Sequence, residues 1–218
     1  MCGRYTLITD IKTIAETFHV APTLQAMPRY NIAPTQDVVT VMRNGEAHLE
    51  LLRWGLIPSW AKDEEVGSRM INARAETLAE KPSFKRLLQM RRCLIVADGF
   101  YEWKAGPGAK SKTPMYITMK DHTPFAFAGL WDVWKNADGQ ILRTCTIITT
   151  EPNELVASIH NRMPAILTPE AREIWLDPEL HDPHTLLPLL AAYPGEMAAR
   201  PVSRLVNNPK YDTPEVLA

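Results

Sequence analysis

Short apolar runs separated by turn residues constrain this chain more than any other feature of its sequence. The run VVTVM is followed by Asn44-Gly45 and then HLELL, the pattern of a two-residue β-hairpin. Turns are also expected at Asp98-Gly99 and Asp138-Gly139, and AGPGAKSK is expected to be a loop. The other runs typical of strands are CLIVA, FYEWK, PMYITM, FAFAGLW and ILRTCTIITT. Their connections are too short for repeated crossover helices, so we expect a mainly antiparallel, barrel-like sheet.

Helices are expected to be few and short. Asp10 can cap a helix that begins at Ile11, because apolar residues follow at helical spacing up to Phe18. Proline in the first turn predicts further helices from Pro82, over 152–159 and over 169–176. No linker composition or internal repeat divides the chain. The prediction is therefore an α+β fold in a single domain, residues 1–218.

Charge and composition limit the possible partners and the compartment. The net charge is −1 and the pI about 6.6, which excludes a generic polyanion binder, although basic residues concentrate between Arg53 and Arg92. The first twenty residues hold no continuous apolar stretch typical of a signal peptide, and no segment is long enough to span a bilayer. The three cysteines form no C-x-x-C pair. We expect a soluble, cytoplasmic monomer without a membrane partner.

Cys2 is the residue that most directly suggests chemistry. Cys93 and Cys145 lie in apolar β-rich runs and are interpreted as buried small hydrophobes. Removal of Met1 would leave Cys2 with a free α-amine (pKa about 7.7–8.0) beside its thiol (about 8.5). Such a 1,2-aminothiol attacks an aldehyde twice, first forming a Schiff base and then a five-membered thiazolidine. The alternative is an accidental cysteine at a frayed terminus; Gly3 favours the first interpretation, because its backbone can closely approach a ligand.

Five segments in a specific order and spacing resemble the signature blocks of the SRAP (SOS-response-associated peptidase) family. They are MCGR at the start, RYNIAPT over 29–35, INARAET over 71–77, DGFYEW over 98–103 and IHNRMP over 159–164. A weaker likeness continues in ARPVSRLVNN, up to Asn208. The resemblance implies a protein that shields abasic sites in single-stranded DNA through a covalent thiazolidine at the mature N-terminal cysteine. It also implies lyase-like Schiff-base chemistry and possible self-removal of Met1.

The resemblance assigns catalytic roles to four residues. Cys2 is the double nucleophile, and Glu102 opens the closed sugar to its aldehyde, helped by a pKa raised among aromatic neighbours. Asn72 would orient the N-terminal amine or the sugar. His160 would lie beside the sugar and its 3′ phosphate, suited to proton transfer and to reversal of the link. Taken alone, the last three residues would be read as structural.

DNA contacts are expected from two groups of side chains. Trp54, Pro58 and Trp60 resemble the wedge that stacks on bases beside the lesion, although tryptophans in an apolar loop usually just pack. A wedge and a sugar pocket both require unstacked bases, so single-stranded DNA is the expected partner. The candidates for phosphate contacts are the arginines inside the blocks, namely Arg4, Arg29, Arg74 and Arg162.

Metal and cofactor sites are not expected. His181 and His184 are separated by Asp182-Pro183 and have no obvious third ligand, and no phosphate-binding glycine motif is present. Two other interpretations remain open. One is a glutamine amidotransferase-like hydrolase, since such enzymes also begin Met-Cys-Gly; the other is a non-catalytic single-stranded DNA binder in which Cys2 is incidental.

Overall fold

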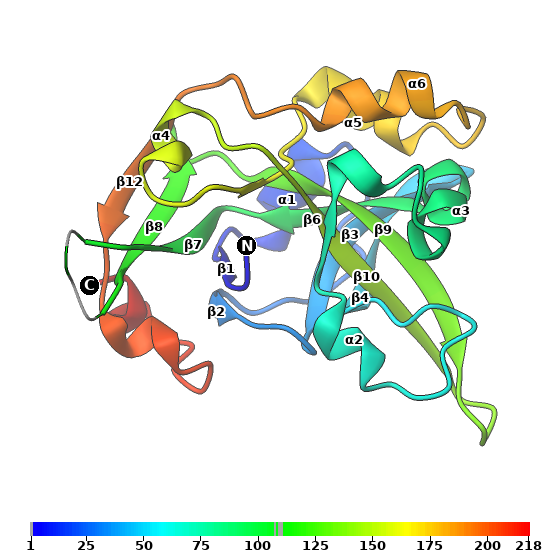
Figure 1. Cartoon of the computed structure of the whole chain (residues 1–218), viewed down its shortest axis with the longest axis horizontal. Helices are drawn as coiled ribbons and strands as arrows, with labels where there is room; N and C mark the ends of the chain where they lie inside the picture. The colour runs from blue at the N-terminus through cyan, green and yellow to red at the C-terminus, as the bar shows by residue number, and fades with distance from the viewer. Residues whose placement is uncertain (1, 107, 109–110) are drawn as a thin grey trace.

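The structure, a computed structural model, describes residues 2–106, 108 and 111–218. Two β-sheets form its centre, with short helices around them (Figure 1). The strands are β1 (Tyr5–Leu7), β2 (Arg29–Ile32), β3 (Asp37–Asn44), β4 (Glu46–Trp54), β5 (Asn72–Arg74), β6 (Arg92–Ala97), β7 (Gly99–Lys104), β8 (Thr113–Met119), β9 (Phe125–Lys135), β10 (Ile141–Thr150), β11 (Met163–Pro164) and β12 (Met197–Pro201).

The first sheet closes on itself as a barrel in the order β10-β4-β3-β6-β9, because β9 pairs again with β10. The closing contact between β4 and β10 is parallel and short, pairing Thr144 with Arg53 and Cys145 with Trp54. Strand β5 also runs parallel to β10, while the remaining ladders are antiparallel. The mainly antiparallel, barrel-like α+β fold predicted from the sequence is confirmed.

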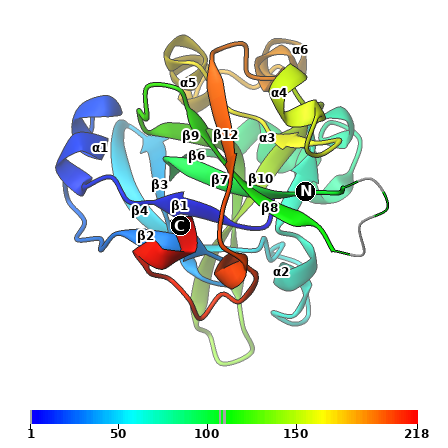
Figure 2. The ribbon, with the colours of Figure 1, turned by 90° about the vertical axis from the view of Figure 1, so that its left-hand side faces the viewer.

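The second sheet has the order β12-β8-β7-β1-β2 and lies beside the barrel (Figure 2). It carries the N-terminal segment on β1 and the DGFYEW block on β7. The chain returns from the barrel to this sheet at Asp98, which lies between the end of β6 and the start of β7. Asp98-Gly99 is therefore a bend between two sheets, and Gly99 is already part of a strand. A Cβ on Gly99 would lie 2.3 Å from the Tyr116 ring, so close packing requires glycine there.

The helices are short and lie mostly on the outside of the barrel. Asp10 caps α1 (Ile11–Thr17) as predicted by accepting from the backbone N–H of Thr13, whereas the helix predicted over 152–159 is reduced to α4 (Glu154–Ala157) after the N-cap Asn153. Two 3₁₀ turns, η3 (Arg204–Asn207) and η4 (Pro214–Leu217), bring the C-terminal segment against β8 and β2. The helices are α1 (Ile11–Thr17), α2 (Val66–Arg69), α3 (Pro82–Met90), α4 (Glu154–Ala157), α5 (Pro169–Leu176) and α6 (Pro183–Leu186); the 3₁₀ turns are η1 (Ala75–Thr77), η2 (Leu187–Leu190), η3 (Arg204–Asn207) and η4 (Pro214–Leu217).

Aromatic and aliphatic side chains fill the barrel. Tyr5 packs edge-on against both Trp54 and Phe127, with ring centroids 5.4 and 5.6 Å apart. Cys93 and Cys145 are buried free thiols, as predicted. Within the described part of the chain, no helix has the length and apolar character needed to cross a membrane.

Candidate active site

Cys2 is buried just before β1 and is held through its backbone. Its carbonyl oxygen accepts a hydrogen bond of 2.9 Å from Asn72 Nδ2, and its Sγ lies 3.8 Å from the carbonyl oxygen of Arg4. Met1, whose removal the aminothiol chemistry requires, lies outside the described residues. The cysteine is thus part of a packed site, which argues against an accidental residue at a frayed end.

Asn72 reaches Cys2 because β5 pairs in parallel with β10, with Asn72 opposite Ile147. Its side-chain amide group donates to Cys2, while its Oδ1 is buried and accepts no hydrogen bond from any residue that the structure describes. An unsatisfied buried acceptor costs roughly 1–3 kcal/mol, so an N–H or O–H donor is needed at this point. Beside Cys2, that donor can be an α-amine or a sugar hydroxyl.

Glu102 lies on β7 with 2% of its surface exposed. Burial raises the pKa of this carboxyl group, against the opposing effect of His160. The distance from Glu102 Oε2 to His160 Nε2 is 4.0 Å. A raised pKa favours the protonated form of this carboxyl group, which is the form that a proton donor requires.

His160 follows α4 and is oriented by its own loop. His160 Nδ1 lies 3.1 Å from the backbone nitrogen of Arg162 and 3.2 Å from the Arg162 carbonyl oxygen, and these contacts turn Nε2 toward Glu102. The histidine can therefore exchange protons with Glu102 or with a ligand between them.

The electrostatic setting keeps the Cys2 thiol protonated. Burial raises the pKa of the thiol, and the negative charge of Glu102 raises it further. A protonated thiol needs a base to take its proton when it attacks. Glu102 is close enough to change the pKa of the thiol and is the candidate for that base. Cys2, Asn72, Glu102 and His160, separated in sequence by up to 158 positions (160 − 2), are brought together by the fold.

Two of the four candidate arginines lie near this site. Arg74 is exposed at the end of β5 and makes no side-chain hydrogen bond or ion pair with the described residues. Arg162, only 15% exposed, donates from both Nη atoms to the two oxygens of Glu76, at 2.6 and 3.0 Å, and from Nη2 to the Thr149 carbonyl at 2.7 Å. Its Nε is buried without a partner in the described chain. Sequence reasoning missed Glu76, although it lies inside the INARAET block.

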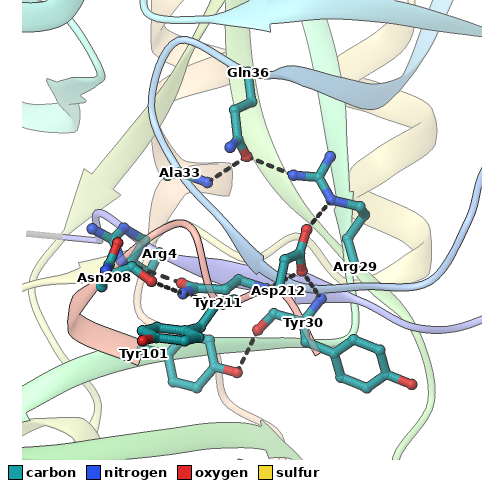
Figure 3. A network of polar contacts seen from close by, with 10 residues as sticks. Arg4, Arg29, Tyr30, Ala33, Gln36, Tyr101, Asn208, Tyr211 and Asp212 are labelled. Atoms are coloured by element: carbon teal, nitrogen blue, oxygen red, sulfur yellow. Dashed lines mark hydrogen bonds and ion pairs between the residues drawn. The ribbon is translucent and has the colours of Figure 1, made fainter. Parts of the chain in front are cut away.

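Arg4 and Arg29 are instead committed to the protein (Figure 3). Arg4 Nη1 donates to the carbonyl of Val206 at 2.6 Å and to Asn31 Oδ1 at 3.2 Å. Arg29 forms an ion pair with Asp212 and donates to Gln36 Oε1 at 2.6 Å. These partners give both arginines a structural role, and their contact with phosphates stays a prediction.

Of the three residues predicted to form the wedge, two are buried and one is exposed. Trp54 is fully buried in the barrel, where its Nε1 donates to the Ile71 carbonyl at 2.9 Å, and Pro58 is also buried. Neither can stack on a base while the core stays closed, so their assignment to the wedge is wrong. Trp60 is 67% exposed and remains available.

The loop that carries Trp60 is fixed on both sides of it. The Ser59 backbone N–H donates to Asp132 Oδ2 at 2.8 Å, and Trp134 Nε1 donates to the Ala61 carbonyl at 2.8 Å. An exposed aromatic on a rigid loop loses little entropy when it stacks.

Among the described residues, no group of three or more His, Cys, Asp or Glu side chains is arranged to hold a metal ion.

The fold and the site define a known class. Residues 1–209 match the model of the SOS response associated peptidase (SRAP) family, and the chain belongs to that family. It is 50% identical to the abasic site processing protein YoqW of Bacillus subtilis, over 100% of this chain and 99% of the relative. It is 37% identical to the abasic site processing protein HMCES of Gallus gallus, over 76% of this chain and 56% of that protein.

Solved structures show the same fold. A protein from Bacteroides thetaiotaomicron superposes with a TM-score of 0.89 at 28% identity, covering 99% of this chain and 98% of that one. A phage-related protein from Bordetella bronchiseptica superposes with a TM-score of 0.72 at 31% identity, covering 93% and 95%.

Proposed function

We propose that this protein recognises abasic sites in single-stranded DNA and links itself to them through a thiazolidine at Cys2, once Met1 has been removed. The observation that carries the proposal is the convergence of Cys2, Asn72, Glu102 and His160, in which a buried Asn72 oxygen lacks a donor among the described residues. Relatives named abasic site processing proteins support the DNA lesion as the substrate.

The first chemical step is the opening of the abasic sugar. An abasic deoxyribose is mostly a closed hemiacetal, so a proton must reach the ring oxygen while the anomeric hydroxyl loses one. Burial raises the pKa of Glu102, which favours the protonated form, and this carboxyl group is the donor. His160 Nε2, 4.0 Å from Glu102 Oε2, is placed to take the second proton and pass it back to Glu102, which can then donate again. The product is the free aldehyde at C1′.

The next steps form two bonds and release one water molecule. The Cys2 α-amine attacks C1′, and the resulting carbinolamine loses its hydroxyl as water when Glu102 supplies a proton, leaving an iminium ion. The Cys2 sulfur then attacks C1′, and its proton passes to Glu102, now a carboxylate. Asn72 Oδ1 accepts from the amine throughout, which satisfies its empty acceptor position.

DNA binding is assigned to a smaller set of side chains than the sequence suggested. Arg74 is exposed and uncommitted among the described residues, Arg162 can be released from Glu76, and Trp60 offers a ring for stacking. Arginine's planar fork suits a phosphate, and stacking contributes roughly 1–3 kcal/mol per base.

The test separates the two nucleophiles of Cys2. Wild type incubated with single-stranded DNA that carries one abasic site should give a band that resists denaturants, and undamaged DNA should give none. Cys2→Ala, after Met1 removal confirmed by intact mass, keeps the amine but cannot close the ring, so its adduct should require borohydride trapping. A heat-stable, untrapped adduct from Cys2→Ala would assign the bond to another residue. Hydrolysis of free glutamine by wild type would support the amidotransferase-like alternative.

A further inference from the structure

The C-terminal segment packs against the strand that carries Glu102. Residues 202–217, called here the C-terminal clasp, contribute Val202, Val206 and Val216 to a second apolar cluster around Tyr101. Side chains alternate along a strand, so Tyr101 and Trp103 lie on the face of β7 opposite to Glu102. Trp103 Nε1 also donates to Asn207 Oδ1 at 2.8 Å. Both sequence neighbours of Glu102 therefore rest on the clasp.

The same clasp holds the segment that carries Cys2. Asn31 is fully buried, and its Nδ2 donates to the carbonyls of Val206, Asn208 and Tyr211 at 3.2, 3.1 and 2.8 Å. Its Oδ1 accepts from Arg4, whose Nη1 also reaches the Val206 carbonyl at 2.6 Å. Arg4 is two residues from Cys2, so the clasp restrains the position of the backbone next to Cys2.

Asp212 and Tyr101 connect these two contacts (Figure 3). Asp212 Oδ1 accepts from the backbone N–H groups of Tyr30 and Asn31, at 2.5 and 2.8 Å. Tyr101 donates from its hydroxyl to the Tyr30 carbonyl at 2.7 Å and from its backbone N–H to the Arg4 carbonyl at 3.0 Å. These hydrogen bonds link the clasp, the segment before β1, β7 and β2 in one continuous ring of contacts.

We infer that the C-terminal clasp positions the Cys2 nucleophile against Glu102, with Asn31 and Asp212 as positioning residues that never touch DNA. The inference rests on the proposed crosslinking function. It assigns a positioning role to the VSRLVNN stretch, which takes no part in the chemical steps. Loosening the clasp should slow bond formation and leave DNA binding intact, because misplacement of reacting groups by about 1 Å can cost roughly 10²-fold in rate.

The experiment uses Asp212→Asn, which keeps the shape of the side chain but replaces one accepting carboxylate oxygen with an NH₂ group. That group would face the donors that Asp212 now binds. Single-turnover crosslinking to single-stranded DNA with one abasic site, at saturating protein, should slow roughly tenfold or more. The Kd for the same DNA carrying a tetrahydrofuran analogue, which has no aldehyde, should change less than twofold. Asn207→Ala is the second variant, for use if Asp212→Asn folds poorly. It changes an exposed residue, deletes only the hydrogen bond to Trp103, and should also slow the reaction.

Asp121→Asn is the matched control, because Asp121 also accepts from a backbone N–H, that of Thr123, yet lies outside the clasp. It should crosslink at the wild-type rate. A purely structural role for the clasp would lower the thermal midpoint and the fraction of protein that reacts, with an unchanged rate constant, and that outcome would overturn the inference. Equal rates for Asp212→Asn, Asn207→Ala and wild type would overturn it too. Absence of any crosslink from wild type would instead refute the proposed function.

Discussion

Glu76 is expected to compete with DNA for Arg162. Both Nη atoms of Arg162 are occupied by the Glu76 carboxylate, so a phosphate can take the guanidinium only after Glu76 moves away. Glu76 is 47% exposed and lines a cavity of about 480 Å³, which gives it room to move. Replacing Glu76 with glutamine removes the charge that holds the pair together, and Arg162 should then be available to DNA at lower cost.

The magnitude follows from the exposure of this ion pair. Solvent screens a half-exposed carboxylate, so the pair contributes about 0.5–1 kcal/mol, the upper part of the range for surface pairs. Glu76→Gln should therefore bind DNA roughly two- to fivefold more tightly. Hydrogen bonds from Arg162 lower the pKa of Glu76, so wild-type Glu76 stays ionised at any pH above its ordinary value of about 4.3. The advantage of the variant should be constant across that range and vanish only in stronger acid.

Fluorescence anisotropy with single-stranded DNA containing a tetrahydrofuran site measures this affinity without the covalent step. Glu151→Gln is the matched control, since it removes one negative charge from the same cavity without touching Arg162. The gain should also disappear in an Arg162→Ala background, because no guanidinium remains to be released. Weaker binding by Glu76→Gln would show that the carboxylate supports Arg162 in its DNA-bound position, and the competition argument would fail.

Four further substitutions have expected outcomes. Glu102→Gln should slow crosslinking by roughly 10²–10⁴-fold with little effect on the Kd. Because burial raises the pKa of Glu102, ionisation of this group destabilises the folded state as pH rises through that pKa. The variant should therefore melt at a higher temperature than wild type at alkaline pH and at the same temperature in acid. Trp60→Ala should weaken binding to single-stranded DNA by about 1–3 kcal/mol without changing the thermal midpoint, whereas Trp54→Ala should lower stability by about 3–5 kcal/mol in chemical denaturation. Arg74→Ala should reduce the slope of log Kd against log salt by about 0.7, the value for one phosphate on a single strand, and an unchanged slope would place the DNA elsewhere.

The sequence predicted the fold where local signals were strong. The Asp10 cap is confirmed, and so is the hairpin at Asn44-Gly45, although Asn44 pairs with Glu46 and only Gly45 lies at the tip. Both predictions held because a turn dipeptide and a capping side chain act within a few residues. Strands β1, β2 and β5 were not predicted, since three or four residues carry no measurable periodicity. Their pairing partners, rather than their own composition, make them strands.

The candidate site was predicted by resemblance more than by physics. Glu102 and His160 taken singly would pass for structural residues, and their order among the other blocks singled them out. Local sequence could not distinguish Trp54 from Trp60, six positions apart in RWGLIPSW, because burial depends on the barrel, to which Trp54 belongs as the last residue of β4. Nor could it show that Arg4 and Arg29 bond to Val206 and Asp212, which are 202 and 183 positions away.

The bond between Arg4 and Val206 has a consequence for how the protein is made on the ribosome. The ribosome adds Val206, whose carbonyl oxygen accepts a hydrogen bond from Arg4, 202 positions after Arg4 itself. While the chain is growing, Arg4 and its close neighbour Cys2 are therefore without this contact. The contact can form only when the segment around Val206 has emerged and docked, so the arrangement of the chain around Cys2 is completed late in folding.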